Sequence, residues 1–158
     1  MDKQLHNLIT RVKIKLEAEP KGIIYGEFYK GNTDIKSSDK VLKPYFEFLG
    51  VTDGARCGVM DFWSFNELGS HQYRIADLIG GLEKWIEIGQ ILYEPLVIDK
   101  HSGEVFCFEQ GYQISTDKSL GDFNYFISNY VFGPKYKEFV PDVDLDDWFQ
   151  FLKRIKFD

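Results

Sequence analysis

The chain has 158 residues, a formal net charge of −6 at pH 7 and an aromatic content of 16%. This length suits one domain, residues 1–158, that buries about two-thirds of the surface exposed by its unfolded form. The acidic balance disfavours direct binding to nucleic acid, which depends on clustered Lys and Arg. No apolar run approaches the ~20 residues of a membrane span, and the N-terminus lacks a signal peptide's apolar stretch. We therefore expect a cytoplasmic protein that does not contact membranes.

The cysteines and histidines give no sign of a metal site. Cys57 and Cys107 do not form a Cys-x-x-Cys pair, and free cysteines are usually found inside proteins, so we expect buried thiols. His6, His71 and His101 are scattered along the chain without the spacing of metal ligands. The sequence therefore predicts neither a metal nor another cofactor.

The first part of the chain predicts a helix, a strand and a loop. Apolar residues recur at helical spacing through residues 2–18, which predicts an amphipathic helix that stops at Pro20. Ile23–Tyr29 is short, apolar and aromatic, as expected of a strand. Lys30–Asp39 is polar and rich in turn residues, so we expect the most mobile loop there.

A second helix is predicted to run through Leu49 and to close at Gly50. Ser37, Ser38 or Asp39 can cap it, and Pro44 delays its regular part. The residues expected to face the core are Val41, Leu42, Tyr45, Phe46 and Leu49.

The middle of the chain predicts an antiparallel sheet. We expect strands near 57–65, 92–99 and 104–109, with a fourth candidate at Tyr112–Ser115. Helical spacing and the glycine pair conflict between Asn66 and Trp85, so no element is assigned there.

The clearest local feature is a hairpin turn, Asp99-Lys100-His101-Ser102-Gly103, between two apolar runs. Asp and Ser side chains can bond to nearby backbone, and Gly adopts a positive φ, as such a turn requires. Two adjacent antiparallel strands follow from this pattern.

Two helices are predicted near the C-terminus, which gives an α+β fold with a central, mainly antiparallel, twisted sheet. The first opens with a Ser-x-x-Asp pattern at Ser119 and ends at Gly133-Pro134. The second spans about 144–156, with Asp144 as its N-cap. Both can cover one face of the sheet. Their apolar faces are Leu120, Phe123, Phe126, Ile127, Tyr130 and Val131 in the first, and Leu145, Trp148, Phe149, Leu152 and Ile155 in the second.

Three segments resemble the SUKH superfamily, which includes fungal cell-wall-synthesis regulators and bacterial immunity proteins. Together they cover roughly residues 42–131. The segments are Leu42–Leu49 followed by Asp53-Gly54, Val59–Leu68, and Trp85–Phe108 with Ser119–Val131. The resemblance implies a single SUKH-like domain that works by binding another protein.

No arrangement of residues predicts catalysis. Asp142–Asp147 has carboxylates spaced like a calcium loop, but Asp147 and Lys153 stand where an EF-hand needs Gly and Glu. Helix capping explains these carboxylates better. A nucleophile elbow and a phosphate-binding glycine loop are both absent from the sequence. We therefore predict a protein without enzymatic activity.

The resemblance implies an immunity protein that binds a cognate toxin domain and blocks it. Exposed aromatic residues would anchor such a partner, and carboxylates would guide a basic one. Taken one at a time, these residues are more simply explained by core packing for the aromatic side chains, a solvated strand face for the acids and helix capping for the acids of Asp142–Asp147. The candidate partner-binding residues are Trp63, Tyr93, Glu94, Asp99, Glu104, Glu109, Asp142 and Asp146.

Two other functions stay open. One is a regulatory scaffold that binds endogenous proteins, as the resemblance to the fungal regulators implies. The other is an enzyme or small-ligand binder with a pocket lined by Tyr73, Trp85 and Tyr93. Trp85 is more simply a core residue, because Ile86 and Ile88 alternate with a polar residue beside it.

Overall fold

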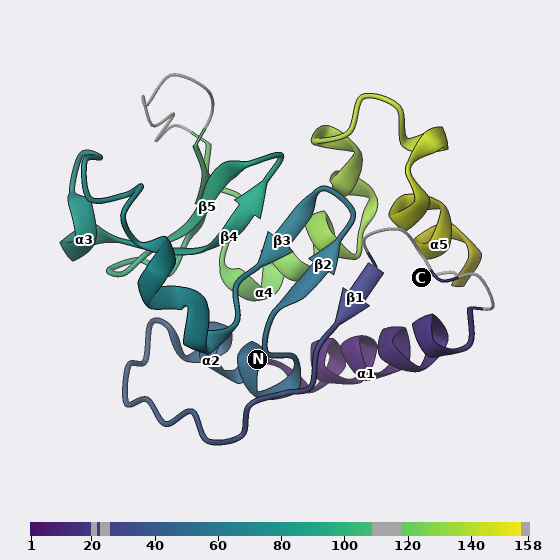
Figure 1. Ribbon diagram of the computed structural model, residues 1–158, viewed down its shortest axis with the longest axis horizontal. Helices are drawn as coiled ribbons and strands as arrows, with labels where there is room; N and C mark the ends of the chain where they lie inside the picture. The colour runs from purple at the N-terminus through teal and green to yellow at the C-terminus, as the bar shows by residue number, and fades with distance from the viewer. Residues whose placement is uncertain (20–21, 23–25, 109–117, 156–158) are drawn as a thin grey trace.

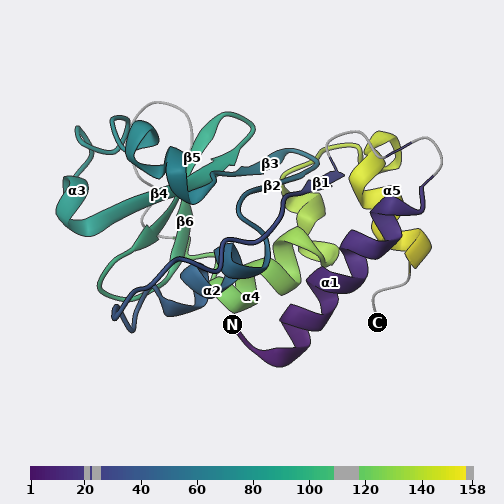
Figure 2. The ribbon, with the colours of Figure 1, turned by 60° about the horizontal axis from the view of Figure 1, so that its bottom comes forward.

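The computed structural model describes residues 1–19, 22, 26–108 and 118–155 (Figure 1). Six strands form one antiparallel sheet in chain order, which confirms the predicted α+β class. Helices α1, α2 and α4 lie together on one side of the strands (Figure 2). The strands are β1 (Gly26–Phe28), β2 (Ala55–Cys57), β3 (Met60–Phe62), β4 (Trp85–Ile91), β5 (Glu94–Asp99) and β6 (Val105–Cys107).

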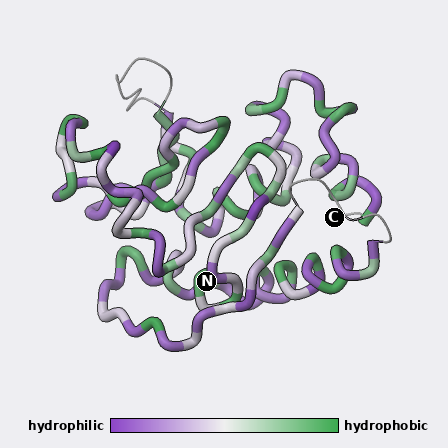
Figure 3. The backbone as a smooth tube through the Cα atoms, in the orientation of Figure 1, coloured by the Kyte–Doolittle hydropathy of each residue, from purple (hydrophilic) through white to green (hydrophobic). Residues whose placement is uncertain are grey.

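The predicted N-terminal helix is confirmed as α1 (Lys3–Glu17). The Asp2 side chain caps it by accepting a hydrogen bond from the Leu5 backbone N–H at 2.7 Å. Polar and apolar residues alternate along its turns (Figure 3), and Leu5, Ile9 and Val12 are buried. One apolar stripe therefore attaches α1 to the domain.

The second helix, α2 (Lys43–Val51), differs from the prediction at both ends. Asp39 does cap the preceding turn, since its carboxylate accepts from the backbone N–H groups of Val41 and Leu42. Val41 was predicted in the core but is 37% exposed, because it lies before the helix begins. Gly50 lies inside the helix and does not close it.

The sequence prediction differs from the structure at two hairpins. It treats the β2–β3 hairpin as one strand, and it lacks the first strand of the β4–β5 hairpin. The single strand expected at 57–65 is the hairpin β2–β3, which turns at Gly58 and Val59. Gly58 has φ +63°, and a Cβ there would overlap the Tyr136 hydroxyl, so the turn needs glycine. The strand expected at 92–99 begins at Glu94, and β4 precedes it as an unpredicted strand.

The predicted hairpin β5–β6 is confirmed, with the expected turn chemistry. Asp99 Oδ1 accepts from the His101 backbone N–H at 2.8 Å. Ser102 Oγ accepts from the Glu104 backbone N–H at 3.2 Å, and Gly103 has φ +76°. The candidate strand Tyr112–Ser115 and the first residues of Ile23–Tyr29 lie outside the described residues.

The C-terminal helices place all but one of their predicted apolar residues in or against the core, but their caps differ from the prediction. Asp122, not Ser119, caps α4 by accepting from the Tyr125 backbone N–H. Asp146, not Asp144, accepts from the Phe149 backbone N–H at the start of the last helix. Leu145 precedes that helix and is 84% exposed, so its predicted core position is wrong. The elements are α4 (Phe123–Phe126), a π-helical turn (Ile127–Val131), short 3₁₀ turns (Pro134–Glu138 and Val143–Leu145) and α5 (Asp147–Ile155).

The span left unassigned contains a 3₁₀ segment, Phe65–His71, and one short helix, α3 (Gly81–Lys84). Gly80 and Gly81 both have positive φ, which explains why the helical spacing around them does not produce a longer helix.

Two apolar clusters lie on opposite faces of the sheet. The main cluster joins the sheet to α1, α2, α4 and α5. The second is smaller and consists of Ile75, Trp85, Val97, Phe106 and Phe108, with Leu78 packed against it. Of the two cysteines, Cys57 is buried in the main cluster, whereas Cys107 is only half-buried. None of the described helices has the length and apolar character needed to cross a membrane.

Candidate functional site

The sheet face opposite the main core is divided into two halves. Over β4, β5 and β6 the second apolar cluster is closed by Ile75 and Leu78, and we call this the covered half. Over β1, β2 and β3 no helix lies in front of the strands in Figure 1, and we call this the open half. The strand residues of the open half are accessible, as the exposed Glu27 and Arg56 show, so this half offers a contact surface.

A row of polar side chains crosses the open half and continues onto the neighbouring strand β4. Glu27, Arg56, Asp61 and Gln90 are consecutive partners in the strand register, so they lie side by side on one face. Asp61 accepts from Arg56 Nε and from Gln90 Nε2, each at 2.9 Å. The hydrogen bond to Asp61 raises the pKa of Arg56. We call these four residues the polar row.

The row ends at an unusual two-residue turn, Leu92-Tyr93, between β4 and β5. Leu92 has φ 49° and Tyr93 has φ 71°, and they are 51% and 82% exposed. Two-residue hairpin turns with positive φ at both positions strongly favour Asn-Gly. A left-handed conformation costs a residue with a side chain about 1–2 kcal/mol. Local stability therefore does not explain why Leu and Tyr occupy this turn.

Neighbouring groups hold the turn in place. The Leu92 backbone N–H donates to the Val59 carbonyl at 3.0 Å, and Arg74 Nη1 donates to the Tyr93 carbonyl at 2.7 Å. Val59 is itself fixed, since its backbone N–H donates to the Tyr136 hydroxyl at 3.0 Å. The tips of the β2–β3 and β4–β5 hairpins thus form one rigid edge.

A buried carboxylate lies where the two halves meet. Glu87 is fully buried on β4 and accepts from Arg74 Nε at 2.9 Å and Arg74 Nη2 at 3.1 Å. Trp63 Nε1 donates to the same carboxylate at 2.9 Å, and the His71 ring stacks on Trp63 with centroids 3.8 Å apart. A buried charge is tolerated only when it is paired and hydrogen-bonded, as it is here.

The same strand position also fixes the segment that closes the covered half. Gln72 Oε1 accepts from the Glu87 backbone N–H, and Gln72 Nε2 donates to the Glu87 carbonyl. Arg74 then links Glu87 to the turn at Tyr93. The sequence prediction missed Glu87 and Arg74. The available sign was a single Glu between Ile86 and Ile88 in an otherwise apolar strand.

A small hollow of about 210 Å³ lies between the polar row and the two hairpin tips. Binding pockets for drug-sized molecules usually have volumes of about 300–1,000 Å³, so this hollow suits one side chain better than a cofactor. Its lining residues are Arg56, Gly58, Val59, Asp61, Gln90, Leu92 and Tyr93.

The predicted partner-binding residues do not form one surface. Tyr93 is on the rim of the hollow, but Glu94 is register partner to Ile91, whose side chain is in the main core, so Glu94 points to the other face. Asp99 and Glu104 lie at the far end of β5, roughly 17–20 Å away for a strand of this length. Trp63 is half-buried against Glu87.

The remaining candidates lie elsewhere. Asp142 caps a short 3₁₀ turn, and Asp146 accepts from the Tyr136 hydroxyl at 2.9 Å besides capping α5. Glu109 lies outside the described residues. Of the suggested ligand pocket, Trp85 is buried in the second cluster, whereas Tyr73 and Tyr93 are exposed.

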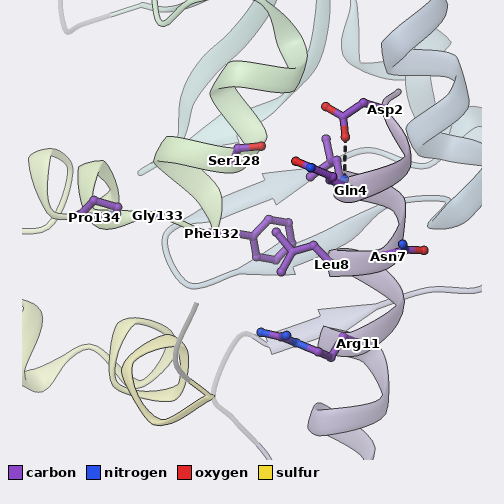
Figure 4. Close-up of a pocket in the computed structure, with 10 residues that line it drawn as sticks. Asp2, Gln4, Asn7, Leu8, Arg11, Ser128, Phe132, Gly133 and Pro134 are labelled. Carbon is purple, nitrogen blue, oxygen red and sulfur yellow. Dashed lines mark hydrogen bonds between the residues drawn. The ribbon is translucent and has the colours of Figure 1, made fainter. Parts of the chain in front are cut away.

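A larger groove of about 660 Å³ runs between α1 and the segment Ser128–Pro134 (Figure 4). Leu8 and Phe132 lie across from each other in it. Its charged lining residues are Asp2, which caps α1, and Arg11. The Asp2 carboxylate already accepts from the Leu5 backbone N–H, and none of the lining residues is a histidine or a cysteine, so the groove shows no nucleophile paired with an imidazole base.

Within the part of the chain that the structure describes, no three His, Cys, Asp or Glu side chains are placed to hold a metal ion. Comparison of the sequence with protein-family models and with curated proteins found no match. The resemblance to the SUKH superfamily therefore stays a prediction, and the candidate site is defined by geometry alone.

Proposed function

We propose that this chain is a non-catalytic protein-binding domain that docks a partner on the open half and the Leu92-Tyr93 turn. The single observation that carries the proposal is this turn. It exposes an aromatic and an aliphatic side chain in a conformation that both residues disfavour, while Arg74 and Val59 hold it rigid. Strained, well-supported residues cluster at binding sites, and rigid aromatic residues are frequent anchors of interfaces.

The resemblance to the SUKH superfamily supports a more specific proposal, a cytoplasmic immunity protein that neutralises a cognate toxin domain. The net charge of −6 supports a basic partner, since opposite charge speeds encounter. A regulatory scaffold for endogenous proteins is the alternative, and it would use the same face.

The test is coexpression of the chain with the protein encoded immediately beside it, scoring cell survival and copurification. A neighbour that kills alone but becomes harmless in a stable complex supports immunity. A harmless neighbour that forms no complex contradicts the toxin pairing, and a pull-down of endogenous proteins then tests the scaffold.

The face is tested with two variants in the same assay. The double substitution Leu92→Asn/Tyr93→Gly installs the favoured turn and removes both exposed side chains. Leu145→Asn removes a leucine that is 84% exposed in the C-terminal segment, about as exposed as Tyr93 at 82%, and serves as the matched control. Loss of the complex in the first variant but not in the second supports the assigned face.

A further inference from the structure

We propose that the hollow beside the polar row receives an arginine side chain of the partner. This inference rests on the proposed function and specifies the chemistry of the contact. Its basis is the combination of hydrogen-bond acceptors, an aromatic wall and a volume suited to one side chain.

The hydrogen-bond acceptors that line the hollow belong to Asp61 and Gln90. Each Asp61 carboxylate oxygen accepts one side-chain hydrogen bond, from Arg56 and from Gln90, although a carboxylate has about four acceptor positions. Gln90 Nε2 is directed at Asp61, and among the residues that the structure describes none donates to Gln90 Oε1. Two neighbouring acceptor groups thus remain available to a ligand that brings several N–H donors.

The wall and the charge favour a planar cation. Leu92 and Tyr93 line the hollow and are exposed, and a tyrosine ring can hold a guanidinium against its face. The charged groups that line the hollow are the Asp61 carboxylate and the Arg56 guanidinium, and Glu27 adds a second carboxylate to the polar row outside the hollow. Arginine fits these features better than lysine, because its planar group both stacks on aromatic rings and donates to two acceptors at once.

The volume of the hollow further limits which groups can occupy it. At about 210 Å³ it is smaller than most small-molecule pockets, and it is open to the surface from which a partner would approach. Gly58 contributes no side chain to the lining and cannot be replaced without striking Tyr136, so the space is a fixed part of the fold.

The test is a titration of the isolated protein with N-acetyl-L-arginine amide, followed by NMR chemical shifts of backbone amides. N-acetyl-L-citrulline amide, which has nearly the same shape without the charge, is the control. We expect saturable shifts confined to Asp61, Gln90, Leu92 and Tyr93 with the arginine compound and none with citrulline. Equal binding of both compounds, or no saturable shift with arginine, overturns the inference.

Two variants keep this test independent of folding defects. Asp61→Asn retains the size and an acceptor, and Tyr93→Asn removes the ring while tolerating a positive φ. Each should weaken binding of the arginine compound about three- to fivefold. The titration uses no partner protein, so a negative result contradicts only the proposed arginine contact. The proposed function is tested separately by the coexpression assay.

Discussion

The two halves of one sheet face differ in what covers them. On the covered half, Trp85, Val97 and Phe106 are buried because Ile75 and Leu78 close over them. On the open half, Arg56 and Asp61 occupy equivalent outward positions and pair with each other. Within each half, the chemistry of the strand residues matches their exposure, as a folded sheet requires.

In the Leu92-Tyr93 turn, the chemistry of the residues does not match their exposure. The turn lies at the edge of the open half, yet its aliphatic and aromatic side chains, Leu92 and Tyr93, are exposed. The comparison therefore separates two kinds of aromatic residue in this protein. Those of the covered half stabilise the fold, and Tyr93 is available for binding.

The largest expected effect comes from removing the centre of the covered half. Trp85→Ala should lower the free energy of unfolding by about 3–5 kcal/mol, because a fully buried indole and its ring contacts with Phe106 and Phe108 are lost. Urea denaturation measures the change. Arg56→Ala on the open half is the control and should cost at most about 1 kcal/mol. An equal loss of unfolding free energy in both variants would contradict the view that only the covered half stabilises the fold.

The next effect concerns the junction at Glu87. Glu87→Ala should destabilise the protein by about 3 kcal/mol, since it leaves Arg74 and the Trp63 indole N–H without their acceptor. Gln90→Ala, three residues further along β4, should lower the free energy of unfolding by less than about 1 kcal/mol. Hydrogen exchange should also show faster exchange at Gln72 and Tyr93 in the Glu87 variant. Unchanged protection there would mean that Glu87 does not join the two halves.

The third effect tests how the open half is anchored. Tyr136→Phe should cost about 1–3 kcal/mol, because the Val59 backbone N–H and Asp146 both lose a partner. Tyr45→Phe is a matched control, because the Tyr45 hydroxyl is buried without a hydrogen-bond partner among the described residues. Its removal should be neutral or slightly stabilising. The reverse order of the two variants in thermal unfolding would contradict this anchoring.

The smallest effect has the opposite sign. Leu92→Asn/Tyr93→Gly should raise the free energy of unfolding by about 1 kcal/mol, because both new residues tolerate positive φ. Chemical denaturation can resolve this gain. A loss of stability would show that the two side chains stabilise the fold, as the aromatic residues of the covered half do.

Much of the fold could be predicted from local sequence patterns. The 3.6-residue spacing gave α1, and the turn residues Asp99, Ser102 and Gly103 gave the β5–β6 hairpin with its hydrogen bonds. The β4–β5 hairpin was missed for the converse reason. Its turn residues, Leu92 and Tyr93, are not turn formers, and their conformation is imposed by Val59 and Arg74 from elsewhere in the chain.

The candidate site could be predicted from the sequence only in part, because it too depends on contacts between distant segments. Tyr93 was identified as a candidate from its chemistry, but its place beside Asp61 depends on the register of three strands. Asp146 was identified by its charge, although its carboxylate serves Tyr136 and α5. Charge and residue type indicate what a surface can bind. They do not indicate which residues share that surface.

Copurification of the Leu92→Asn/Tyr93→Gly variant with the partner found by coexpression tests whether the turn is a binding element. If the turn is a binding element, the variant should be at least as stable as the unmodified protein and should fail to retain the partner. A variant that retains the partner as well as the Leu145→Asn control does would contradict the assignment of this face.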